Sequence, residues 1–294
     1  MAGRFRRGWA LTKQSWRAFR NEPTLMVFPL LSGIGMTIVT AVIATITVLL
    51  DPGLLDFDTD NNAHWTDPIV YVAFAVGIYL CTFIAVYFNV ALAACAARSL
   101  SGDTVSLRDG LSTASQRLRS ICGWALIAGT VGLILDTFGD AGGWTQRITV
   151  SLAGAAWKIA SFFVVPLIAL EGEAPWNALK RSSRVIRQHW GESATGVVTV
   201  GAIFGFLFLP PFILLVTSLT FFIGFATTDT SDGGLLAAIA FLVVLACAAA
   251  CALILIVSSA LTGVFRVAVY LYAQTGEVPP AFDAASIQGA VLSR

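Results

Sequence analysis

Lys158 is the residue of this sequence whose type and position could most directly do chemistry. It is the single charge in the apolar run from Ile148 to Leu170. It follows about 11 residues of that run, which places it roughly 16 Å deep at 1.5 Å per helical residue. A charge near the middle of a bilayer costs at least ~2.5 kcal/mol. A lysine kept there could form part of a polar binding site or of a polar conduit.

Asn89 and Thr262 share one feature with Lys158, because each precedes a glycine–acid pair by thirteen or fourteen residues. The three pairs are Gly102-Asp103, Gly172-Glu173 and Gly276-Glu277. If the pairs mark equivalent positions of a repeat, the three polar side chains lie at similar depth and could face a common interior. The alternatives are an interhelical hydrogen-bond cluster, in which Lys158 reaches Asp136, or a Lys158 tolerated where water thins the lipid.

No catalytic constellation is visible in the sequence. There is no Walker loop, HExxH or GxSxG, and the two histidines are the isolated His64 and His189. Asp56, Asp58 and Asp60 have the spacing of a calcium loop, but the glycine and closing glutamate of that motif are missing. The five cysteines lie in apolar segments without a CxxC pair, as buried hydrophobes do. We therefore expect no enzyme, no cofactor and no metal.

The elements that must position these residues are helices in lipid. The chain of 294 residues is 57% hydrophobic and 12% charged, whereas soluble domains carry about 25% charged residues. We expect one all-α membrane domain, residues 1–294, with six transmembrane helices. The spans are expected near residues 25–50, 69–97, 121–138, 148–170, 194–225 and 235–272.

The fifth span is too long to cross the bilayer as a straight helix perpendicular to the membrane. Its ~32 residues would give a helix of ~48 Å against a hydrocarbon core of ~30 Å. We expect Pro210-Pro211 to break or tilt it. Gly201 and Gly205 form a GxxxG pair, which permits close helix approach but arises easily by chance in glycine-rich spans.

Basic amphipathic segments outside the spans predict contact with lipid headgroups. They cover residues 1–22, 98–120 and 171–192, where apolar side chains recur at helical spacing between cations. The expected partners are anionic lipids of the inner leaflet. The expected headgroup contacts are Arg4, Arg6, Arg7, Lys13, Arg17, Arg117, Arg119, Lys180, Arg181, Arg184 and Arg187.

The charge on the connectors predicts the topology. The basic segments alternate with loops at 51–68, 136–147 and 226–234, which carry several aspartates and one cation, Arg147. The positive-inside rule then places both termini in the cytoplasm, with a cytoplasmic tail at 273–294. The chain is thus expected to form three helical hairpins of one orientation, each followed by a cytoplasmic surface helix. With a net charge of +1, we expect no nucleic-acid partner, and the oligomeric state stays open.

Three stretches carry a resemblance to a known family. They read GWALTKQSWRAFRNEPTLMVFPLLSG, FNVALAACAARSLSGDTVSLRDGL and AAWKIASFFVVPLIALEGEAPWNALKRSSRVIRQHWGE. There the chain resembles uncharacterised prokaryotic six-span membrane proteins, a family described as a domain of unknown function. It is distantly similar to the membrane domain that accompanies some glycerophosphodiester phosphodiesterases. The resemblance implies a multi-pass plasma-membrane protein. It supplies no catalytic residues, and the chain lacks the soluble phosphodiesterase domain.

These patterns favour a non-enzymatic role in handling lipids or small solutes, or in organising the membrane. The alternative is a transporter or channel with a polar pathway between the repeats near Lys158. A wet cavity at the level of Asn89 and Lys158 would favour transport. A close-packed centre with lipid beside the amphipathic helices would favour the membrane-organising role.

Overall fold

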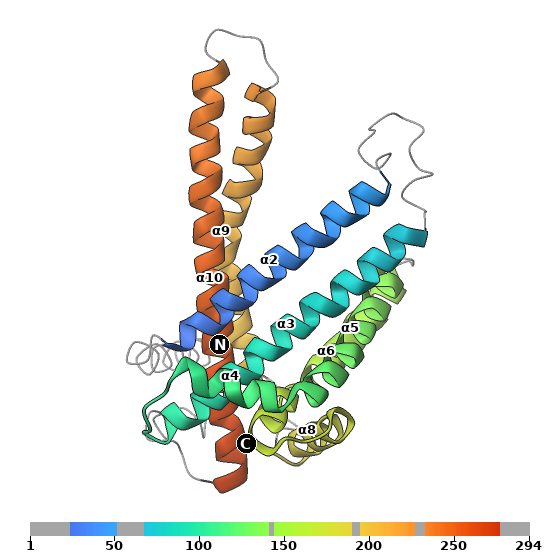
Figure 1. The fold of residues 1–294 in the computed structure, drawn as a ribbon, viewed down its shortest axis with the longest axis vertical. Helices are drawn as coiled ribbons and strands as arrows, with labels where there is room; N and C mark the ends of the chain where they lie inside the picture. Colours follow the sequence, from blue (N-terminus) through green and yellow to red (C-terminus); the bar gives the residue numbers. More distant parts are fainter. Residues whose placement is uncertain (1–23, 52–67, 141–143, 190–194, 227–232, 277–294) are drawn as a thin grey trace.

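The fold is all-helical in the part of the chain that the structure, a computed structural model, describes. These are residues 24–51, 68–140, 144–189, 195–226 and 233–276. The long helices are α2 (Thr24–Leu50), α3 (Pro68–Leu100), α5 (Leu118–Asp140), α6 (Trp144–Ala160), α9 (Thr195–Ala226) and α10 (Gly233–Thr275) (Figure 1). The short elements are α4 (Leu107–Gln116), α7 (Val164–Pro166), the π-helical turn η3 (Leu167–Glu171) and α8 (Pro175–His189).

Six segments of the described chain are long and apolar enough to cross a membrane. They are Thr24–Leu50, Pro68–Leu100, Leu118–Phe138, Gln146–Glu171, Gly205–Gly224 and Leu236–Thr275. Their outer surfaces carry large apolar side chains, such as Leu49 at 74% and Phe206 at 79% exposure. Such surfaces are stable where lipid replaces water, because apolar side chains lose nothing by facing hydrocarbon. The expected multi-pass membrane protein is confirmed.

The helices are joined tightly at one end and spread apart at the other. Figure 1 shows α9 and α10 side by side, and this pair diverges from α2 and α3, which contact each other. The short helices α4 and α8 lie at the closed end, where α3 ends and α5 begins. Two groups of spanning helices therefore share one anchored end.

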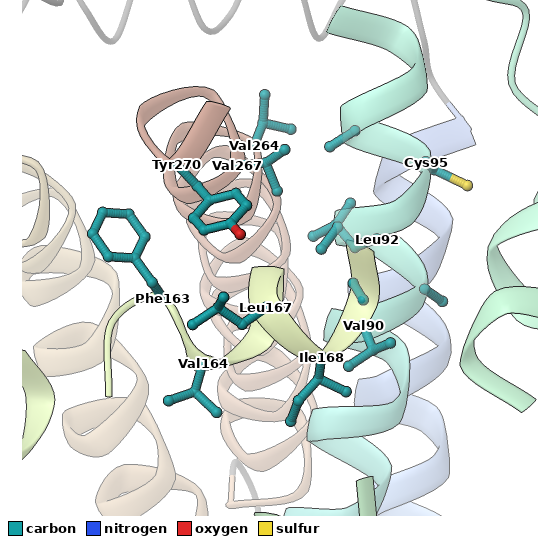
Figure 2. Close-up of a cluster of buried hydrophobic side chains, with 14 of the residues drawn as sticks. Val90, Leu92, Cys95, Phe163, Val164, Leu167, Ile168, Val264, Val267 and Tyr270 are labelled. Atoms are coloured by element: carbon teal, nitrogen blue, oxygen red, sulfur yellow. The ribbon is translucent and has the colours of Figure 1, made fainter. Parts of the chain in front are cut away.

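The buried core lies at the closed end. The segment from Phe163 through η3 passes between α3 and α10, and its side chains meet those of both helices (Figure 2). Phe163, Leu167 and Ile168 are fully buried, as are Val90 on α3 and Val267 on α10. The core thus joins the segment after α6 to both α3 and α10 at this end of the bundle.

The fourth span, expected near residues 148–170, covers Gln146–Glu171 and is interrupted within that range. Helix α6 ends at Ala160, and a turn then leads into α7 and η3. Pro166 has no backbone N–H, and in a continuous helix its ring would clash with the carbonyl of Phe162, four residues earlier. The Phe163 N–H, freed from helical bonding, donates instead to Ser182 Oγ of α8 at 3.0 Å. Ser182 is completely buried, so this bond avoids the cost of an unpaired buried donor, about 1–3 kcal/mol.

Of the two outcomes expected for the proline pair of α9, a break or a tilt, the structure excludes the break, and the GxxxG pair is open at Gly205. Helix α9 is continuous from Thr195 to Ala226 with Pro210 and Pro211 inside it, so the expected break is absent. A Cβ atom added at Gly205 would meet nothing within 4 Å, so no neighbour approaches closely there. Tilt remains the means by which so long a helix can fit a bilayer.

Three glycines of the described chain adopt positive φ, and they are those of the glycine–acid pairs. Their φ angles are 88° at Gly102, 68° at Gly172 and 71° at Gly276. The Gly172 N–H bonds Ile168 O at 3.1 Å, and the Gly276 N–H bonds Tyr272 O at 2.9 Å. Glycine tolerates this left-handed conformation without steric cost, so it ends a helix sharply.

Candidate functional site

A cavity of about 690 Å³ lies between α2, α3 and α10. It begins where the core ends, because Leu92 of α3 belongs to the buried core and also lines the cavity. Toward the open end, its lining residues Ile34, Ile38 and Leu255 are 49%, 57% and 55% exposed. The cavity is therefore accessible from the side of the helix bundle. In a spanning protein that side faces lipid.

The lining is apolar with a few uncharged polar groups. The polar side chains come from all three helices: Ser32, Thr37, Asn89, Ser258 and Ser259. Asn89 Nδ2 donates to Ala85 O at 2.8 Å, and Ser258 Oγ donates to Leu255 O at 3.1 Å. These bonds stay within each helix, so the side-chain oxygens remain as acceptors. No Asp, Glu, Lys or Arg is among the lining residues. Such a cavity suits a largely apolar guest with few polar atoms.

Lys158 lies near the closed end of α6, and Asn89 is not among its described contacts. The lysine side chain is exposed on α6, two residues before that helix ends. The neighbouring Trp157 stacks on Trp124 of α5, with 5.6 Å between ring centroids. Trp124 lies six residues after Leu118, the first residue of α5, or roughly 9 Å of helix. The level of Trp124 thus places Lys158 about 9 Å of helix from the closed end. A lysine chain can snorkel much of that distance, and the end of α6 favours a cation.

Asp136 and Thr262 also lie apart from Lys158. Asp136 is exposed and follows Trp124 by twelve residues, about 18 Å along α5, so it lies far from the level of Lys158. Thr262 Oγ1 donates to Ser258 O at 2.7 Å within α10. Of the four polar residues expected to share a site, Asn89 alone lines the cavity, and the Lys158–Asp136 contact is not formed.

A second polar cluster lies at the closed end around Glu171, the last residue of η3. Its carboxylate accepts hydrogen bonds from the Tyr270 hydroxyl and from Gln274 Nε2 of α10, and it pairs with Arg181 of α8. Arg181 also pairs with Glu173, with 3.3 Å between Nη1 and Oε1. Burial lowers the pKa of Arg181, but Glu171, Tyr270 and Glu173 together outweigh it, and the net pKa is raised. Glu171 therefore connects α10 to α8, because it accepts hydrogen bonds from α10 and pairs with Arg181, which stays charged.

The basic residues expected at lipid headgroups have different surroundings. Lys180, Arg184 and Arg187 of α8 are exposed, and Lys180 Nζ lies 5.5 Å from the centre of the Trp176 ring. Arg181 is engaged by Glu171 and Glu173. Arg119 is exposed, whereas Arg117 is half-buried. The remaining predicted contacts lie outside the described residues: Arg4, Arg6, Arg7, Lys13 and Arg17.

Sequence reasoning missed most of the cavity lining and the partners of Glu171. Serines and threonines are common in apolar helices and usually bond to their own backbone, so Ser32 and Ser259 carry no distinctive signal. Tyr270 and Gln274 are spaced four residues apart on one helix face, which was a usable sign of a polar stripe.

The comparisons with known proteins give one match. The chain matches a family described as "Family of unknown function (DUF6159)" over residues 69–279. No curated protein and no solved structure matches it.

Proposed function

The chain belongs to this family of unknown function, and we propose that it is a non-enzymatic membrane protein that binds a lipid in the cavity between α2, α3 and α10. The observation that carries the proposal is the cavity itself, about 690 Å³, within the size range of ligand sites. Its side opening and uncharged apolar lining suit an acyl chain with a glycerol or ester group near Asn89.

Filling the cavity should abolish binding of an acyl-chain probe. We expect Ser259→Phe, which places a ring in the cavity, to weaken binding of cis-parinaric acid at least about ten-fold, a loss of about 1.4 kcal/mol. Asn89→Leu, which keeps the volume, should weaken it less. Probe fluorescence with the purified full chain in detergent measures the affinity.

The matched control is Ser151→Phe, because Ser151 is exposed on α6 and does not line the cavity. It should bind the probe as the wild type does. Unchanged binding by Ser259→Phe, or an equal loss with Ser151→Phe, would contradict the proposal.

We further propose a prokaryotic plasma-membrane location with both termini in the cytoplasm. The support is the charge pattern together with the position of α4 and α8, which carry Arg108 and Lys180, at one end of the bundle. Single cysteines at Asp58 and Ser183, in a chain whose five native cysteines are replaced, should react with an impermeant maleimide from opposite sides of sealed cells. Reaction of both from the same side would exclude this topology.

The hairpin repeat and the surface role of the amphipathic segments are part of the proposal. The repeat is supported by the contacts of α2 with α3, α5 with α6 and α9 with α10, and by the left-handed glycine after each second helix. The surface role is supported by the exposed cations of α8. Anionic inner-leaflet lipids are the proposed partners.

The alternative, a transporter or channel with its pathway near Lys158, has weaker support. Lys158 faces outward on α6, and the cavity lining has no charge that could coordinate an ion. Similarity to the membrane domain of glycerophosphodiester phosphodiesterases stays a prediction, and we infer no activity from it.

A further inference from the structure

A hollow of about 330 Å³ lies where α4 ends and α5 begins. Its lining includes Arg117, Arg119 and Ser120 at the junction and Gly172 after η3. We propose that this hollow binds the phosphate of an anionic lipid headgroup. The inference does not depend on the cavity between α2, α3 and α10.

The Nε atom of Arg117 has no acceptor in the part of the chain that the structure describes. Arg117 ends α4, where its N–H bonds Ala114 O at 3.0 Å, and its guanidinium lies against Gly172. A side chain at position 172 would occupy the place of that guanidinium, so the left-handed glycine makes room for it. Arg117 Nε is buried and has no hydrogen-bond partner among the described residues. Since leaving a buried N–H unpaired is costly, an acceptor from outside the chain would stabilise this arginine, and its positive charge favours an anion.

The rest of the hollow is also suited to an anion. Arg119 supplies a second guanidinium, and an arginine pair can hold phosphate oxygens with several charge-assisted hydrogen bonds. The first turn of α5 adds the positive end of a 23-residue helix. No carboxylate is among the lining residues to compete for the arginines.

The position of the hollow favours a lipid over a free phosphate. Leu118, between the two arginines, is the first residue of the apolar span Leu118–Phe138 and is 42% exposed. Pro175, the first residue of α8, lies against Gly123 of α5, and the adjacent Trp176 is 57% exposed. Exposed leucine and tryptophan beside cations are typical of the membrane–water interface. A phosphate in the hollow would thus be at headgroup level, with acyl chains along α5.

Native mass spectrometry of the purified full chain tests the assignment, with dihexanoyl phosphatidylglycerol as the probe and sodium phosphate as competitor. The wild type should bind phosphatidylglycerol more tightly than dihexanoyl phosphatidylcholine. Arg117→Gln and Arg119→Gln should each weaken binding about ten-fold or more, as loss of a charge-assisted hydrogen bond implies. Arg117→Lys, which keeps the charge but loses the planar fork, should fall between them and the wild type.

Arg108→Gln is the matched control, since Arg108 is exposed on α4 and does not line the hollow. It should bind as the wild type. Arg119 is exposed, so Arg119→Gln reports on the site even where Arg117→Gln fails to fold. Equal loss in Arg108→Gln would indicate diffuse attraction, and competition by sodium phosphate at the lipid's own concentration would indicate a free-phosphate site. Either result, or wild-type binding by Arg119→Gln, overturns the lipid assignment.

Discussion

Replacing Glu171 by alanine is expected to lower the free energy of unfolding by about 2–4 kcal/mol, because it removes one carboxylate from three partners. Tyr270 is 1% exposed, so its hydroxyl would lose its acceptor in a place that water hardly reaches. Such an unsatisfied group costs about 1–3 kcal/mol. The half-exposed pair with Arg181 adds about 1 kcal/mol at most. Thermal unfolding in detergent, followed by near-ultraviolet circular dichroism, measures the change.

Glu173→Ala is the control that separates the hydrogen bonds from the ion pairs. Glu173 also pairs with Arg181, yet it accepts nothing from Tyr270 or Gln274. Its replacement should cost under about 1 kcal/mol. In a double-mutant cycle, Tyr270→Phe should cost much less in the Glu171→Ala background than in the wild type. If Glu171→Ala and Glu173→Ala lower the free energy of unfolding equally, the hydrogen bonds of Glu171 to Tyr270 and Gln274 do not stabilise the fold.

Gly110→Ala should destabilise the chain by about 1–3 kcal/mol, although alanine forms helix better than glycine. Gly110 is buried in α4, where α3 and α2 meet it. An added Cβ would lie 2.7 Å from Cys95 Sγ, 2.8 Å from Phe28 Cζ and 2.9 Å from Ala91 O. The last of these is backbone of α3 and cannot rotate away, so α4 must shift. The loss should appear as a lower unfolding temperature.

Gly205→Ala is the matched change in open surroundings. Nothing lies within 4 Å of a Cβ at that position, so helix propensity alone should act and stabilise the chain by up to about 1 kcal/mol. A Gly110→Ala protein as stable as Gly205→Ala would mean that α4 does not pack tightly on α3.

The membrane-spanning helices could be predicted from the sequence because lipid imposes the same requirement on every segment that crosses it. Backbone polar groups must be satisfied internally, so a long apolar run such as Thr24–Leu50 has to be helical. Helix ends at Gly102 and Gly172 were readable for a similar reason, since local conformation alone stops the helix there. The polar character of Asn89 was also visible, and it does line the cavity.

The position of each polar side chain along its span, and the residues that it contacts, could not be predicted from the local sequence. Counting residues placed Lys158 at the middle of its span, but the chain turns after Ala160, so the part of the span beyond Lys158 is not one straight helix. The cavity is lined by α2, α3 and α10, which are far apart in the chain and meet only in the folded protein. Glu171 meets Tyr270 across 99 residues of chain. Hydropathy alone determined which segments enter lipid, whereas packing between distant segments decided what each polar side chain meets.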